Sequence, residues 1–299
     1  MIWPSVLAGM DAWTLSMVLA AGAFYASSLV ATGGVLFRLA LPWQPGRVGL
    51  RRSVVAAAWL ALALLLLQWP LQAGFLGGST LAAALDPMLL GVIFDSAQGT
   101  RMMLAASGLL LLHGVLIDSG RMRYLGFALS VTGVVLVLLA FTQVGHTTDE
   151  PRWLLAGLLL VHLAAVAFWV GALLPLYRMA GQAIPRQVVA RVLVVFGQVA
   201  SVTVGLLVAA AVGLSWLLLG GVAPLLETDY GQTLLLKILL VLLLLALAAL
   251  NKWRLVPAFE RGEPGADRRL RRSILGEGLL VLLILFVTAL MTTTTSPNG

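Results

Sequence analysis

Cysteine is absent from this 299-residue chain, and charged residues make up only 10% of it. The lack of cysteine excludes disulfides, iron–sulfur clusters, thiolate zinc sites and cysteine nucleophiles. The scarcity of charge excludes an ordinary soluble domain, in which about a quarter of the residues are charged. The chain is instead 61% hydrophobic, with a mean hydropathy of +1.02. We therefore expect one polytopic membrane bundle.

Apolar stretches of about 20 residues are long enough to cross roughly 30 Å of hydrocarbon as α-helices. The predicted fold is all-α, with eight membrane spans grouped into an N-terminal half, 1–143, and a C-terminal half, 144–299. No Lys or Arg precedes the first span, which is therefore not expected to be a cleavable signal peptide. The spans are expected at 13–37, 53–73, 101–118, 123–143, 152–176, 192–219, 231–251 and 273–292.

Basic residues are distributed unevenly between the two sides of these spans. Sixteen of the 19 Lys and Arg residues fall between spans 1 and 2, 3 and 4, 5 and 6, or 7 and 8. The other side carries most of the acids: Asp11, Asp86, Asp95, Asp149, Glu150, Glu227 and Asp229. The positive-inside rule then predicts that both chain ends face outward. The net charge of +7 therefore indicates orientation, and no nucleic-acid partner is expected.

Two connections are longer than a turn. Residues 74–100, on the outer side, mix apolar residues with two acids and predict a short interfacial or re-entrant segment, a candidate lid over an outward-facing site. Residues 254–272, on the inner side, combine glycine, proline and alternating charges, which predicts a solvated connector. Within the first span, Gly33 and Gly34 predict a close approach between helices.

Only three histidines occur in the chain. His113 and His162 are each expected roughly 15–18 Å into a span, near the midplane, where an imidazole is a functional candidate. The alternative for both is a hydrogen bond between packed helices. His146 follows the fourth span at the outer surface, where it would collect a cation together with nearby carboxylates or simply be solvated.

Methionine is the second candidate ligand type, since thioethers and imidazoles suit Cu(I). Met102 and His113 are eleven residues apart and share a helix face, and Met10 and Met17 share another. Ordinary core packing is the alternative for each methionine. The set is weighted toward the predicted outer half, which contains Met10, Met17, Met88, Met102, Met103 and Met291.

Two charged residues lie inside predicted spans. Lys237 is expected to extend its ammonium to the outer interface. Glu277 is placed about one turn into the last span, near a helix N-terminus that favours a carboxylate. Their depths differ, so no mutual salt bridge is expected. The chain has no GxSxG, Walker, GxGxxG or HExxH motif, and we do not expect an enzyme.

The segment HTTDEPRWLLAGLLLVHLAAVAFWVGALLPLY resembles the His-containing span of the copper resistance protein D (CopD) family. In that family a His is followed seven residues later by Trp, then by a Gly-rich stretch and Leu-Pro-Leu, matched here by His162, Trp169, Gly171 and Pro175. The resemblance covers roughly residues 140–297. Its downstream matches are Tyr230, Gly231, Lys237, Asn251, Arg254, Pro257, Arg272, Ser273 and Glu277.

The resemblance implies a bacterial inner-membrane protein that moves copper from periplasm to cytoplasm, with both chain ends periplasmic and a periplasmic CopC-like copper-binding protein as partner. It carries over His162, Trp169 and His146. His113, Met17 and Met102 are candidates from the residue analysis alone.

The working prediction is a copper permease that uses His and Met ligands. Outer ligands would come from His146, Met10, Met17, Met102 and Met103. A midplane site would contain His162 and His113, with Trp169, Lys237 and Glu277 in support. A neutral ligand set favours Cu(I) over Cu(II).

Two alternatives stay open. The two span histidines would also suit a single bis-His haem b. The chain would otherwise serve as a membrane dock for a periplasmic copper chaperone and transport nothing.

Overall fold

The computed structural model describes the whole chain except residues 1–9, 119, 146–149, 220–222 and 295–299. Within the described ranges the chain forms helices and no strands. Eight of these helices are long and apolar enough to cross a membrane. The predicted all-α fold with eight spans is confirmed.

The eight spans occur in chain order, some as a helix continued by a short turn of different pitch. Short helices α4 (Leu81–Ala84) and α5 (Pro87–Phe94) follow the second span, and α10 (Ala223–Glu227) precedes the seventh. The spans are α2 (Ala12–Ala40), α3 (Arg47–Leu76), α6 (Ala97–Leu111) with η1 (Leu112–Leu116), α7 (Met122–Ala140) with η2 (Phe141–Gln143), α8 (Arg152–Met179), α9 (Arg186–Leu219), α11 (Asp229–Leu250) with the π-helical turn η4 (Asn251–Leu255) and α12 (Val256–Arg261), and α13 (Ala266–Thr294).

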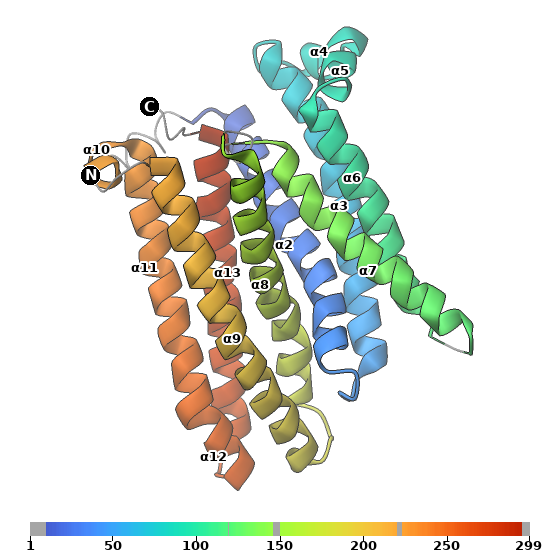
Figure 1. The fold of residues 1–299 in the computed structure, drawn as a ribbon, viewed down its shortest axis with the longest axis vertical. Helices are drawn as coiled ribbons and strands as arrows, with labels where there is room; N and C mark the ends of the chain where they lie inside the picture. The colour runs from blue at the N-terminus through green and yellow to red at the C-terminus, as the bar shows by residue number, and fades with distance from the viewer. Residues whose placement is uncertain (1–9, 119, 146–149, 220–222, 295–299) are drawn as a thin grey trace.

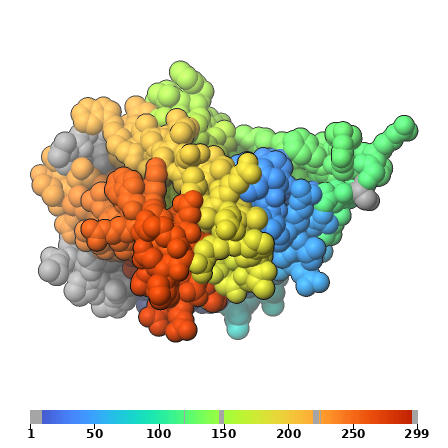
Figure 2. Space-filling model, turned by 90° about the horizontal axis from the view of Figure 1, so that it is seen from below, coloured from blue at the N-terminus to red at the C-terminus, as the bar shows by residue number. Residues whose placement is uncertain are grey.

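The bundle has two distinct ends (Figure 1). The upper end holds the start of α2, the short helices α4 and α5, and the end of α13. The lower end holds the connections that follow α2, η1, α8 and α12. Figure 2 views this lower end, where α12 and the start of α13 lie beside the connection between α8 and α9. The sixteen basic residues assigned to one side of the spans lie toward this end.

Helix α2 occupies the middle of the bundle and packs against α3, α8 and α13. Its contact with α8 is made backbone to backbone, because a Cβ on Gly33 would overlap the Ala167 carbonyl and one on Gly171 would overlap the Gly33 backbone. Gly34 faces the Val54 side chain of α3 at similarly short range. The close approach predicted at Gly33 and Gly34 is confirmed, and it follows the small-residue packing typical of membrane helices.

The outer segment 74–100 includes α4 and α5, and its predicted interfacial position stays a prediction. Asp86 caps α5 by accepting hydrogen bonds from the backbone N–H groups of Met88 and Leu89. Trp69 of α3 donates its indole N–H to the Leu90 carbonyl at 3.0 Å, which ties α5 to the bundle. These helices pack at the upper end and do not line the large cavity described below.

The inner segment 254–272 differs from the predicted solvated connector. Most of it is helical, since it includes the end of η4, all of α12 and the first two turns of α13. Gly262 ends α12 in the left-handed region, with φ 76°, a conformation that glycine adopts without strain. The Arg-rich run 268–272 consists of good helix formers and continues directly into the apolar part of α13. The connector prediction was wrong because charge marks the membrane boundary and not the end of a helix.

Candidate functional site

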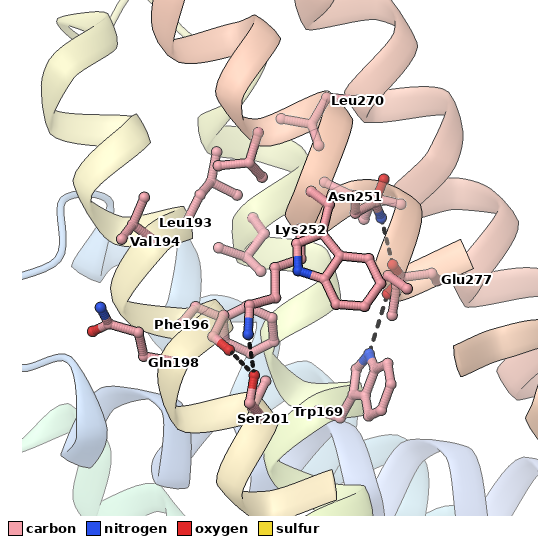
Figure 3. A pocket seen from close by; sticks show the side chains of 18 of the residues that line it. Trp169, Leu193, Val194, Phe196, Gln198, Ser201, Asn251, Lys252, Leu270 and Glu277 are labelled. Atoms are coloured by element: carbon pink, nitrogen blue, oxygen red, sulfur yellow. Dashed lines mark hydrogen bonds between the residues drawn. The ribbon is translucent and has the colours of Figure 1, made fainter. Parts of the chain in front are cut away.

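A cavity of 580 Å³ lies in the lower half of the bundle, between α8, α9, α13 and the segment from α11 to α12. Leu, Val, Ala and Trp side chains form most of its wall (Figure 3). The polar side chains that reach it are Gln198, Ser201, Asn251, Lys252, Glu260 and Glu277. A mainly apolar cavity with a few convergent polar groups is the usual form of a ligand site or passage.

Three side chains from separate elements meet on the cavity wall. Trp169 of α8 donates its indole N–H to Glu277 Oε2 at 3.1 Å. Asn251 of η4 donates Nδ2–H to Glu277 Oε1 at 2.5 Å. All three residues are more than nine-tenths buried, and Figure 3 shows the Glu277 carboxyl group between the other two. We call these three residues the Glu277 cluster.

The local sequence explains how Asn251 reaches the cluster. Pro257 has no backbone N–H, and in a regular α-helix its ring would meet the carbonyl of Trp253. The chain avoids this conflict by forming the wider π turn of η4, which begins at Asn251. Such π turns inside α-helices are frequent at functional sites. Here the turn directs the Asn251 amide toward α13.

The rim of the cavity is charged. Lys252 donates its ammonium to Ser201 Oγ of α9 at 2.6 Å, which links η4 to α9 (Figure 3). Glu260 of α12 also lines the cavity, and both charged residues are exposed. The cavity therefore passes from a solvated rim to the buried Glu277 cluster.

Glu277 is not placed as the sequence predicted. It lies eleven residues, or about 16 Å, after the first residue of α13, so the N-terminal dipole is three turns away. Its stabilising partners are Trp169 and Asn251. The macrodipole explanation was wrong because α13 begins at Ala266, well before its apolar part.

His162 lies on α8 seven residues before Trp169, on the same helix face and about 10 Å nearer the upper end. Its imidazole is close to the Leu207 carbonyl of α9 and to Lys237 of α11. Its Nδ1 is buried and has no hydrogen-bond partner among the described residues. His162 therefore lies between α8, α9 and α11, in line with the cluster.

His113 is not near the midplane. It lies in η1, sixteen residues into the span that runs from Ala97 to Leu116, and so close to the lower end. Its Nδ1 is 3.1 Å from the carbonyl oxygens of Leu109 and Leu110, and its ring meets the Trp59 ring edge to face at 5.0 Å. The predicted depth was wrong because the span starts before Arg101.

Arg101 itself is buried inside α6, one turn after its start. It donates to Gln68 Oε1 at 2.7 Å and to Gln98 Oε1 at 3.0 Å, and its guanidinium lies over the Phe24 ring. It therefore belongs to the packed interior and does not mark a membrane boundary.

The structure does not bring His113 and His162 together. His113 packs against Trp59 of α3, whereas His162 lies close to Leu207 of α9 and Lys237 of α11. Figure 1 shows α3 on one side of α2 and α8, and α9 and α11 on the other. A bis-His haem between them therefore has no geometric support. His146 lies outside the described residues.

The methionine candidates are dispersed. Met102 is part of the buried core and is 9% exposed, while its neighbour Met103 is 56% exposed. Met17 is half-buried on α2, and Met10 packs against the cluster around Val18. Among the residues with described positions, no three His, Asp or Glu side chains gather into a metal site.

The sequence pointed to Trp169 and Glu277 separately, but it did not predict that they are in contact. The residues of the Glu277 cluster are separated by 108 and 26 positions, so no local spacing reveals them as a group. The one local signal was Asn251 followed six residues later by Pro257, at the end of an apolar span.

Comparison with protein families supports the resemblance found in the sequence. Residues 190–291 match the family model of copper resistance protein D (CopD). The match includes α9, α11, α12 and nearly all of α13, and thus Asn251, Lys252 and Glu277, while α8 lies before it. No curated protein and no solved structure showed a significant match. The chain is therefore a multi-span membrane protein whose residues 190–291 are similar to the copper resistance protein D family.

Proposed function

We propose that this protein transports copper as Cu(I) across the bacterial inner membrane, from periplasm to cytoplasm, and is not an enzyme. The observation that carries the proposal is the cavity, which lies between α8 and the CopD-matched helices and ends at a buried carboxylate. Burial of an acid inside an apolar bundle is energetically unfavourable, and intramembrane acids usually mark an ion pathway.

The basic lower end would face the cytoplasm, as the positive-inside rule requires. The cavity would then open toward the cytoplasm, and copper would enter from the upper end. His162 lies above the Glu277 cluster along α8, with an unpartnered buried Nδ1 among the described residues. A neutral imidazole suits Cu(I), and the Glu277 carboxylate below it would balance the charge of the passing cation.

Capture at the upper end is proposed to involve His146, Met10, Met17 and Met103, with copper delivered by a periplasmic CopC-like protein. Delivery by a partner is favoured because the described part of the chain contains no three-residue His, Asp or Glu site. Met102 is assigned to core packing, given its burial.

The test is Cu(I) uptake into proteoliposomes that contain equal amounts of His162→Ala, His113→Ala or unchanged protein. We expect His162→Ala to lower the initial rate by about tenfold or more, as loss of a metal-site group typically does. His113→Ala is the matched control, since it removes an imidazole outside the path, and should stay within about twofold of unchanged protein.

Unchanged uptake in His162→Ala would contradict the proposed path. If the unsubstituted protein takes up no copper but still binds the periplasmic donor, a docking role is correct and transport is not. A Soret band in the purified protein would indicate haem instead.

A further inference from the structure

Glu277 is held in an unusual way for a buried acid. Its two described hydrogen-bond partners, Trp169 and Asn251, are neutral donors, and no ion pair among the described residues includes it. A permanent charge inside a membrane is unfavourable without a cationic partner. The surroundings therefore suit a group that changes its charge.

Among the described residues, no other charged or titratable side chain forms a hydrogen bond or ion pair with Glu277. Lys252 donates to Ser201, and Glu260 lies exposed at the rim. Lys237 lies near His162. Among the other groups, Arg271 of α13 donates to Tyr177, Arg38 pairs with Asp118, Tyr25 bonds Thr292, Arg178 donates to Ser53, Arg261 and Arg269 pair with Glu263, and Arg254, Arg268 and Arg272 are exposed.

The Asn251 amide has one hydrogen-bonding atom without a partner among the described residues. Its Nδ2 donates to Glu277, while its Oδ1 is buried and has no hydrogen-bond partner in the described part of the chain. A half-turn of the amide exchanges the nitrogen and the oxygen without moving the backbone. In the first orientation Asn251 donates to a carboxylate, and in the second its oxygen accepts from a carboxylic acid.

Trp169 restricts where a proton can sit. An indole N–H only donates, so Glu277 Oε2 must remain an acceptor in both charge states. The oxygen that faces Asn251 is Oε1, and only there does a rotatable neighbour offer an acceptor. The geometry therefore selects one atom of the carboxyl group.

We propose that Glu277 and Asn251 form a proton-binding site, with the proton on Oε1, that exchanges with water in the cavity and couples the passage of copper to release and rebinding of this proton. The coupling, but not the site, rests on the proposed function. When Cu(I) reaches the cluster, the O–H bond of Glu277 breaks, the proton passes to cavity water, and the carboxylate balances the cation. When copper leaves, a proton from the cavity restores the acid, so one proton is released and one is bound again for each copper ion that passes.

A proton fits this site better than a sodium ion does. Hard metal cations need several oxygen ligands at once. Both oxygens of Glu277 already accept hydrogen bonds from N–H donors, so they are not available together as ligands for sodium. A proton needs only one acceptor, and the turned Asn251 amide supplies it.

The direct test is infrared difference spectroscopy of the full chain in liposomes, comparing acid with alkaline buffer and following the carbonyl band of protonated carboxylic acids. We expect a titrating band that disappears in Glu277→Gln and remains in Glu260→Gln, the matched control on the same cavity. Asn251→Leu should shift the band, because the acid loses its acceptor, and Glu277→Asp should shift it without removing it. Adding Cu(I) at constant pH should remove it from the unchanged protein.

A pH difference spectrum that is identical in the unchanged protein and in folded Glu277→Gln and Glu277→Asp would overturn the proposal. So would a band that responds to sodium at constant pH. If the Glu277 band titrates but the vesicles take up no copper, the proton site stands and the transport function fails. Copper uptake without the band would show the reverse.

Discussion

Asp118 and Glu277 are two acidic residues whose carboxyl groups have different kinds of hydrogen-bond partner. Asp118 follows η1 at the lower end and pairs with Arg38 at 2.6 Å and with Arg51, joining the ends of α2, α3 and η1. Glu277 lies on a cavity wall and is held by neutral donors. The Asp118 carboxylate therefore has two cationic partners, whereas Glu277 has an indole and an amide as its hydrogen-bond partners. We therefore expect Asp118 to stabilise the fold and Glu277 to take part in the proposed transport.

The largest effect on stability is expected where α2 crosses α8, between the Asp118 ion pairs and the Glu277 cluster. Gly171→Leu would force the two backbones apart, and we expect a loss of more than about 3 kcal/mol in folding free energy. The result should be little or no monodisperse protein after purification. Gly157→Leu on the same helix is the control, because a Cβ at Gly157 meets nothing within 4 Å. Equal yields of the two variants would contradict the close contact.

The ion-pair region predicts the next largest effect on stability. Asp118→Asn leaves Arg38 and Arg51 without their carboxylate, and the side chains involved are 22% to 25% exposed. We expect a loss of about 1 to 2 kcal/mol, less than for a fully buried pair because water screens part of the interaction. Thermal unfolding in detergent measures this, and high salt should reduce the difference from unchanged protein. A difference that high salt leaves unaltered would argue against the ion pair.

Substitutions in the Glu277 cluster are expected to have a smaller effect on folding free energy. Trp169→Phe removes the N–H that Oε2 accepts while keeping an aromatic ring, and should cost about 0.5 to 1.5 kcal/mol. Copper uptake should fall several-fold while unfolding shifts only modestly. Trp253→Phe is the control, since Trp253 lines the same cavity but is 73% exposed. Indistinguishable uptake in the two variants would remove Trp169 from the path.

The smallest effect is expected at the cavity rim. Lys252→Met removes the exposed contact with Ser201 and should change stability by less than about 0.5 kcal/mol. Uptake should stay within about twofold of unchanged protein. A strong loss of uptake would move the functional site from the Glu277 cluster to the rim, and proteoliposome flux distinguishes the two.

Much of the fold was predictable from composition and pattern. Apolar length gave eight spans, glycines marked the α2–α8 approach, and the distribution of arginines matched one end of the bundle. Helix ends were less predictable, as the segment 254–272 and His113 show. Hydropathy marks where a helix enters lipid, while capping groups such as Gly262 mark where it stops.

The candidate site was predictable only in parts. Trp169, Asn251 and Glu277 each matched a family pattern, but their convergence depends on how α8, η4 and α13 pack. His113 and His162 were expected at the same depth in the membrane, which suggested a shared site. The depth of a residue along its helix does not determine which neighbouring helix its side chain faces. The structure separates them, since His113 packs against Trp59 and His162 lies near Lys237.

The central claim is tested most directly by measuring Cu(I) uptake per folded molecule for Glu277→Gln and Asp118→Asn side by side. A glutamine at 277 still accepts the Trp169 N–H, and Asn251 turns to accept from its amide, so this variant should fold normally. We expect Glu277→Gln to lower Cu(I) uptake by about tenfold or more. Uptake by Asp118→Asn should stay within about twofold of unchanged protein, despite the lower stability of this variant. Full uptake by Glu277→Gln, or a loss of uptake confined to Asp118→Asn, would contradict it.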